Sequence, residues 1–139
     1  MKVVINKRYG GFGLSYKACM RYAELKGFTL YPFMDRIEDG IPDLRHFVQW
    51  DGKGKQPYWI HYSTSPLDKN GRYEEESYWS DDSVKRNDPV LIQVVEELGD
   101  EANGEHAKLE IVEIPDGVEC NIEEYDGNEW VSEEHRTWG

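Results

Sequence analysis

Residues 7–15, with the sequence KRYGGFGLS, combine positive charge with a glycine-rich backbone. Lys7 and Arg8 come shortly before three closely spaced glycines, Gly10, Gly11 and Gly13. A helix is expected to begin just after them, and a helix N-terminus presents unpaired N–H groups and the positive end of a dipole. Glycines allow a ligand to approach such a backbone closely. The segment therefore predicts a site for a small anion, such as the phosphate of a nucleotide.

Side chains near this loop could hold the rest of such a ligand. Tyr9 or Phe12 could stack on a nucleobase, because an aromatic face can bind the face of any base. Ser15 is expected to cap the helix with its hydroxyl and to border the same site. A second wall of the site is predicted from three residues elsewhere in the chain, which are Trp59, His61 and Arg136.

A structural interpretation of these residues stays open beside the functional one. The GGFG stretch matches neither the dinucleotide-binding fingerprint nor the P-loop, so the glycines could simply form a tight turn between a strand and a helix. Aromatic residues around Trp59, on an expected strand, could belong to the core, as most such residues do. Arg136 could neutralise its neighbouring glutamates instead of a ligand.

The remaining reactive side chains show no catalytic pattern. The four histidines lack the spacing of metal ligands, and Cys19 lies among apolar residues, where a thiol is usually inert. Adjacent carboxylates are frequent, but in a chain with 28 Asp and Glu they indicate a solvated face. We therefore expect a non-enzymatic protein with no cofactor and no metal. An enzyme of unknown type is the last of the alternatives.

Charge is distributed unevenly along the chain. Residues 1–34 carry a net charge of +5, whereas residues 35–139 carry a net charge of −17. Most of the surface would repel a polyanion, so duplex nucleic acid is not expected as a partner. The basic start could attract a small anion, while the acidic remainder favours a basic host protein. An alternative function is therefore an acidic inhibitor that imitates nucleic acid and docks through its C-terminal hairpin.

Length and composition bound the class of protein. A chain of 139 residues predicts a single domain, residues 1–139. Two cysteines are too few for a disulfide framework, and no apolar run approaches the roughly 20 residues that a membrane helix needs. We expect a cytoplasmic protein that binds no membrane. The five Trp and nine Tyr permit a homo-oligomer formed through an exposed sheet edge.

Apolar patterns predict the elements that must position these residues. Helices are expected at residues 16–26 and at about 89–102, each after a capping residue. Gly and Pro content predicts an irregular insertion at about 35–57. Strands are expected at 3–6, 28–31, 58–64, 73–79, 109–114, 118–125 and 129–137, the last two as a hairpin. This order predicts an α+β fold with a single mixed, largely antiparallel sheet and two helices packed on one face.

Both ends of the chain carry longer motifs. The opening reads VINKRYGGFGLSYKACMRYAELKG, a later block reads DPVLIQVVEELGDEANG, and the close reads VEIPDGVECNIEEYDGNEWVSEEHRTW. In these segments the chain resembles a family of small acidic proteins encoded in bacteriophages and prophages. The resemblance implies a phage accessory protein without an assigned enzymatic activity, acting in the bacterial cytoplasm against host defence. Family members often have a cysteine where this chain has Arg8, so no nucleophile is expected in the loop.

Overall fold

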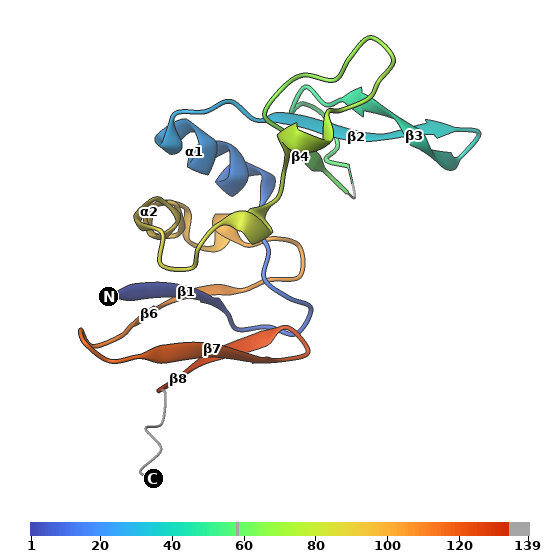
Figure 1. Cartoon of the computed structure of the whole chain (residues 1–139). Helices are drawn as coiled ribbons and strands as arrows, with labels where there is room; N and C mark the ends of the chain where they lie inside the picture. The colour runs from blue at the N-terminus through green and yellow to red at the C-terminus, as the bar shows by residue number, and fades with distance from the viewer. Residues whose placement is uncertain (58, 134–139) are drawn as a thin grey trace. The chain divides into compact units, whose positions relative to one another are not determined.

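In the computed structural model, which describes residues 1–57 and 59–133, the chain divides into two compact units. Unit 1 combines residues 1–25 with the chain from Val84 onward, and unit 2 is Lys26–Ser83. Figure 1 shows the elements of each unit. The single domain expected over residues 1–139 stays a prediction, because compactness does not show whether the units fold together.

Unit 1 contains two antiparallel strand pairs that form separate sheets. β1 (Lys2–Asn6) pairs with β6 (Leu109–Glu113), and β7 (Cys120–Tyr125) pairs with β8 (Asn128–Glu133). The turn between β7 and β8 is Asp126–Gly127, where φ is 52° and 88°. Positive φ at both central residues is the geometry that an Asp-Gly hairpin turn favours, so the predicted hairpin is confirmed.

Both long helices belong essentially to unit 1 and lie on the same side of the β1–β6 pair (Figure 1). They are α1 (Tyr16–Lys26) and α2 (Pro89–Leu98), and a short 3-10 helix, η3 (Gly99–Ala102), continues α2. The Asp88 carboxylate accepts a hydrogen bond from the Val90 amide at 2.8 Å. Asp88 therefore caps α2, as the sequence predicts.

The strand β1 carries the centre of the unit 1 core. Successive side chains of a strand point to opposite faces. Val3 and Ile5 pack with Ile114 and with partly buried residues of the β7–β8 hairpin. Val4 is fully buried and points to the opposite face, toward α2. Burial on both faces fixes β1, and with it the start of the glycine loop.

Unit 2 is built around one four-stranded antiparallel sheet. Its elements are β2 (Tyr31–Glu38), β3 (Ile41–Gln49), β4 (His61–Ser63), η1 (Glu75–Ser77), β5 (Tyr78–Trp79) and η2 (Asp81–Ser83). The strand order is β3-β2-β4-β5. The Phe33 side chain is completely buried, and its ring lies 5.1 to 5.3 Å from the rings of Phe47, His61 and Tyr73.

The predicted α+β class is confirmed, with strands paired antiparallel and two helices on one face of a sheet. The described strands form three sheets, however, where the sequence predicts a single mixed one. The sheets stay separate because the edge of β1 opposite β6 is closed by side chains and by a loop, so no further strand of the described residues pairs with it.

The irregular insertion expected at about residues 35–57 is a second correction. Residues 31–49 form an antiparallel hairpin, β2–β3, with a shift of register between Asp35 and Arg36. Asp39 and Gly40, with φ of 52° and 78°, make its turn. Pro42 suggested a break, but it lies on β3, an edge strand, where a missing N–H is tolerated.

Candidate functional site

The glycine loop, defined here as Tyr9–Leu14, connects β1 to α1, and Ser15 closes it. The Ser15 hydroxyl accepts a hydrogen bond from the Ala18 amide (3.1 Å) and donates one to the Glu101 carbonyl (2.6 Å). The Ser15 amide donates to the Ala102 carbonyl (2.9 Å). Ser15 is thus the cap of α1, as expected, and its polar groups bind other parts of unit 1.

Backbone groups of the glycine loop also pair with the rest of unit 1. The Gly10 amide donates to the Asp126 carbonyl at 3.0 Å, and the Gly13 carbonyl accepts from the Gly104 amide at 2.9 Å. A Cβ atom on Gly104 would lie 2.7 Å from the Gly13 carbonyl carbon, and one on Gly127 would collide with the loop backbone. The glycines therefore allow three backbone segments to meet closely.

These contacts support the structural interpretation of the loop as a tight turn. At least the Gly10 amide, which was expected to face a ligand, already has a partner within the protein. An anion at this loop would depend on the side chains of Lys7 and Arg8 and not on that amide. Binding of an anion there stays a prediction.

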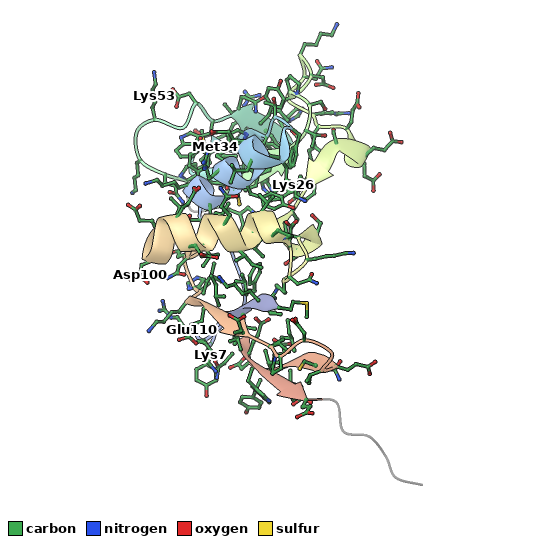
Figure 2. All side chains as sticks on the ribbon, turned by 90° about the vertical axis from the view of Figure 1, so that its left-hand side faces the viewer. Lys7, Lys26, Met34, Lys53, Asp100 and Glu110 are labelled. Carbon is green, nitrogen blue, oxygen red and sulfur yellow. The ribbon has the colours of Figure 1, made fainter. Side chains whose placement is uncertain are left out.

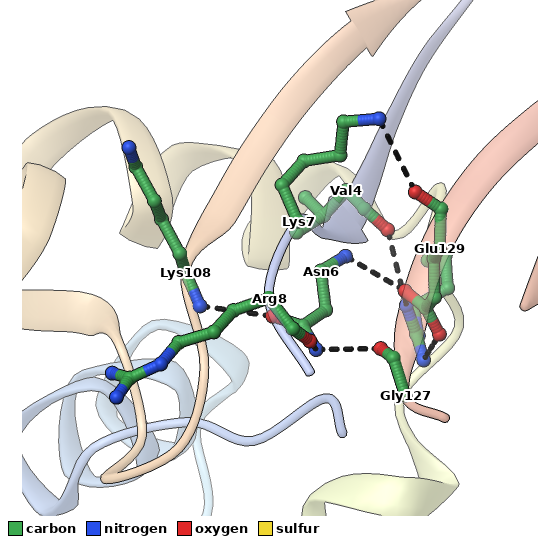
Figure 3. Close-up of polar contacts among 8 residues, drawn as sticks. Val4, Asn6, Lys7, Arg8, Lys108, Gly127 and Glu129 are labelled. Atoms are coloured by element: carbon green, nitrogen blue, oxygen red, sulfur yellow. Dashed lines mark hydrogen bonds and ion pairs between the residues drawn. The ribbon is translucent and has the colours of Figure 1, made fainter. Parts of the chain in front are cut away.

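The side chains predicted to bind a ligand, Lys7, Arg8 and Tyr9, differ in how accessible they are to it. The Lys7 ammonium lies 3.4 Å from the Glu129 carbonyl oxygen. The Arg8 guanidinium is exposed and points away from these polar contacts (Figure 3), and it has no ion-pair partner among residues 1–57 and 59–133. Tyr9 is 61% exposed. Of these three side chains, Arg8 and Tyr9 are therefore the ones that a ligand could reach most easily.

Phe12, the second aromatic residue of the loop, has a structural contact on one face of its ring. The central carbon of the Arg86 guanidinium lies 3.6 Å from the ring centroid. A guanidinium over an aromatic face is attracted by the ring quadrupole. Arg86 thus occupies one of the two ring faces of Phe12 that could stack on a nucleobase.

Arg86 belongs to a network with Val4, Asn6 and Glu129 that closes the edge of β1 opposite β6. Figure 3 labels the last three of these residues. The Arg86 guanidinium donates to the Glu129 carboxylate, with Nη2 at 2.8 Å from Oε2. The Glu129 carboxylate also accepts the Asn6 amide at 2.7 Å. The Val4 amide donates to the Arg86 carbonyl at 2.8 Å. The β1 edge is thereby satisfied without a neighbouring strand.

The β7–β8 hairpin presents one face to the core and the other to solvent. Cys120 and Val131 belong to the face that packs on the β1 core. The opposite face, called here the acidic-aromatic face, is formed by the cross-strand pairs Asn121–Ser132, Glu123–Trp130 and Tyr125–Asn128. Tyr125 is 71% exposed and Trp130 is 39% exposed. The Trp130 indole donates to the Glu123 carboxylate at 3.1 Å, which orients the indole on the surface.

Negative charge dominates the sequence around this face. Residues 109–133 contain nine Asp or Glu and no Lys or Arg. All of these acids except Glu129 are exposed, including Glu110 on β6 (Figure 2). Large aromatic side chains and exposed carboxylates thus share one hairpin.

Trp59 and His61, predicted as a second wall, belong to unit 2, where their rings lie 6.2 Å apart. His61 Nδ1 lies 3.2 Å from the Tyr78 hydroxyl, and His61 Nε2 lies 3.4 Å from the Asp35 carboxylate. Burial, with Tyr73 next, raises the pKa of Tyr78 above its ordinary value. A phenol that keeps its proton donates a hydrogen bond, so this chain of contacts indicates structural pairing and not a nucleophile.

Three further features were considered from the sequence: Arg136, a metal site and a membrane-spanning helix. Arg136, the third residue of the second wall, lies outside the described residues. Within residues 1–57 and 59–133, no group of three or more His, Cys, Asp or Glu side chains could hold a metal ion. In the same part of the chain, every helix is too short or too polar to cross a bilayer.

Sequence reasoning missed one cavity. A groove of about 860 Å³ lies in unit 2 along β3, lined by Arg36, His46 and the loop Leu67–Arg72. Five of its eleven lining residues fall in the segment that was predicted to be irregular, residues 35–57. The sequence does contain a signal for this groove, because two cations, Lys69 and Arg72, flank the turn pair Asn70–Gly71.

Comparisons of the chain with protein-family models, with curated proteins and with solved structures found no match. The resemblance to phage proteins in the terminal segments stays a prediction. The exposed surfaces of the two units are therefore the features from which a function can be proposed.

Proposed function

We propose that the chain is a non-enzymatic binding protein that docks on a basic surface of another protein through its acidic-aromatic face. One observation carries the proposal: exposed Tyr125 and Trp130 occur on a hairpin whose surroundings carry eight exposed acids and no Lys or Arg from residue 109 to 133. Tyr and Trp are the side chains most enriched at the energetic centre of protein interfaces. A field of one sign attracts a partner of the opposite charge.

The biological setting that we propose comes from the resemblance in the terminal segments. The protein would be a phage accessory protein that acts in the bacterial cytoplasm and antagonises a host defence enzyme. Its carboxylates would occupy a groove that normally binds the phosphates of a nucleic acid. The chain's net charge of −12 supports this role, because such a groove is basic.

Two triple variants of equal charge change test the docking face. The face variant replaces three exposed acids on and beside this face, Glu119→Gln, Glu123→Gln and Asp126→Asn. The control replaces three exposed acids of unit 2, Glu74→Gln, Glu75→Gln and Glu76→Gln. Quantitative mass spectrometry would identify proteins captured from defence-active bacteria at low and high salt. The expected partner is basic, binds wild type and control equally, and is lost with the face variant or at high salt.

Substitution of the two aromatic residues provides an independent test. We expect Tyr125→Ser with Trp130→Ser to weaken binding of the captured partner about 30-fold, the effect of one hot-spot residue of about 2 kcal/mol. If the face variants and the control retain the same proteins in the same amounts, the acidic-aromatic face is not the interface.

A second function is supported by the exposed Arg8 guanidinium beside exposed Tyr9. We propose as the alternative that these side chains and Lys7 bind a small anionic, nucleotide-like ligand. An arginine can hold two phosphate oxygens at once, and a tyrosine can stack on a base.

A further inference from the structure

The groove in unit 2 has a volume of about 860 Å³, within the range of sites for small organic molecules. One wall is β3, with the end of β2 beside it, and the other is the loop Leu67–Arg72. This groove takes no part in the docking face proposed above, which belongs to unit 1.

The loop wall of the groove is held in a defined shape by its own hydrogen bonds. The Asp68 carboxylate accepts the amides of Asn70 (2.8 Å) and Arg72 (3.0 Å). The Asp68 amide donates to the Arg72 carbonyl at 2.8 Å. Asp68 is therefore engaged by the loop backbone and forms no ion pair with Lys69 or Arg72 in the described part of the chain.

The loop is also fixed to the sheet at two points. The Phe47 amide donates to the Gly71 carbonyl at 2.8 Å, and a Cβ on Gly71 would lie 2.6 Å from the Phe47 carbonyl oxygen. The Gln49 side chain accepts the Leu67 amide (3.2 Å) and donates to the Pro32 carbonyl (2.9 Å). A groove whose walls are joined in this way is formed before a ligand arrives, which lowers the cost of binding.

The charges that line the groove differ in whether they have partners. Arg36 is paired with Glu38 at 2.8 Å, and His46 is paired with Asp43 at 2.7 Å. Lys69 and Arg72 are exposed, and neither cationic group has a hydrogen bond or an ion pair within the described part of the chain. The groove lining carries three cations, Arg36, Lys69 and Arg72, against the carboxylate of Asp68, which gives it a formal net charge of +2 on a chain of net charge −12.

We infer that this groove binds a small organic phosphate, with Lys69 and Arg72 holding the phosphate oxygens. The forked Arg72 guanidinium can donate to two oxygens, and the Lys69 ammonium adds a point charge. Val48, which is 41% exposed, and Leu67 supply apolar surface for the organic part of the ligand. A phosphate is favoured over a carboxylate because two cations would meet a charge near −2.

Titration of the full chain with ATP, followed by amide chemical shifts in NMR spectra, tests this inference. We expect shifts to change at residues 46–49 and 67–72, and pyrophosphate to change mainly those of the loop. Adenosine alone should give no change at the same concentration. The apparent affinity should fall as salt is added, because the groove is open to solvent.

Two double variants complete the test. Lys69→Gln with Arg72→Gln should weaken ATP binding about tenfold or more, since charge-assisted hydrogen bonds are lost. Lys53→Gln with Lys55→Gln removes the same charge from another loop of unit 2 and should leave ATP affinity unchanged. Dispersed amide spectra of both variants would show that they are folded. Absence of shift changes in the groove, or equal weakening by both variants, would overturn the inference. Neither result would affect the docking face, whose variants lie in unit 1.

Discussion

Arg86 and Glu129 meet at two points, with Nη1 bound to Oε1 and Nη2 bound to Oε2 at 2.8 Å. The Glu129 side chain is only 8% exposed, and its carboxylate also accepts the Asn6 amide. Because Arg86 also covers Phe12, a single guanidinium joins the hairpin strand β8 to the glycine loop. The pair holds together the segment that carries the proposed docking face and the segment that the sequence marked as a binding loop.

Glu129→Gln is expected to lower the free energy of unfolding by about 3 kcal/mol, because it leaves a partly buried guanidinium without its counter-charge. Urea denaturation followed by tryptophan fluorescence would measure the change. Glu133→Gln, on the same strand but exposed, should change stability by no more than about 0.5 kcal/mol. Equal effects of the two substitutions would show that the Arg86–Glu129 pair has no special role in stability.

Tyr22 is expected to make stability depend on alkaline pH. Its hydroxyl donates to Asp88 at 2.7 Å, and burial, followed by this hydrogen bond, raises the pKa of Tyr22 above its ordinary value of 10.0. A raised pKa in the folded state means that the unfolded state ionises first. The free energy of unfolding should therefore fall as pH rises above about 10.

Tyr22→Phe should remove part of that alkaline decline and cost about 1 kcal/mol at neutral pH. Urea denaturation at a series of pH values up to the alkaline limit would measure both effects. Tyr125→Phe, at an exposed position, should keep the decline of the wild type. A decline in Tyr22→Phe as steep as in the wild type would contradict this assignment.

Gly127→Ala and Gly40→Ala form a matched pair of glycine substitutions. Both glycines have positive φ, 88° and 78°, so each alanine would cost about 1–2 kcal/mol of backbone strain. A methyl group on Gly127 would also collide with Gly11, whereas one on Gly40 would meet nothing within 4 Å. Thermal unfolding should show Gly127→Ala to be more destabilising by about 1–3 kcal/mol. Similar melting temperatures would show that the contact with Gly11 can relax at little cost.

The proposed ligand at Arg8 predicts a thermal shift with cyclic or linear nucleotides. A ligand at a hundredfold excess over its Kd adds about 2.7 kcal/mol to the free energy of unfolding. Lys7→Ala with Arg8→Ala should abolish the shift if the ligand binds at the glycine loop. Lys69→Gln with Arg72→Gln should abolish it if the ligand binds in the unit 2 groove. A shift that survives both pairs would exclude both locations, and no shift with any nucleotide would contradict the glycine-loop site.

The parts of the fold that the sequence predicts well are those with strong local signals. Ser15 and Asp88–Pro89 predict the starts of α1 and α2, and the two helices do begin at Tyr16 and Pro89. Asp126–Gly127 likewise announces the β7–β8 hairpin. Local capping and turn chemistry decide such boundaries, so the sequence alone contains enough information.

The β2–β3 hairpin was missed although it has the same turn signal, Asp39–Gly40. Pro32 and Pro42 suggested breaks on either side of it. Pro32 lies near the start of β2, where its carbonyl still accepts the Trp50 amide, so the strand tolerates a residue without an N–H at this position. The pairing of a strand with its neighbours is a tertiary property. Whether a proline breaks a strand depends on whether a neighbouring strand needs its N–H, and the sequence alone does not show this.

The candidate site was predictable only in part, for a related reason. Residues 7–15 do lie on one loop before a capped helix, as expected. The partners of Gly10 and Gly13, however, are Asp126 and Gly104, more than 90 residues away in the chain. Whether a backbone amide is open to a ligand depends on such distant segments, and no local pattern reports them.

The contact of Gly127 with Gly11 has a practical consequence for protein engineering. An inserted peptide, such as an epitope tag, would find no room in the Asp126–Gly127 turn, because that turn is seated on the glycine loop. The Asp39–Gly40 turn has the same local conformation and nothing above it, so it is the permissive position for a label. The Asp126–Gly127 turn and the glycine loop consequently constrain each other's length. A homologue with an insertion in one of them would need a changed conformation in the other.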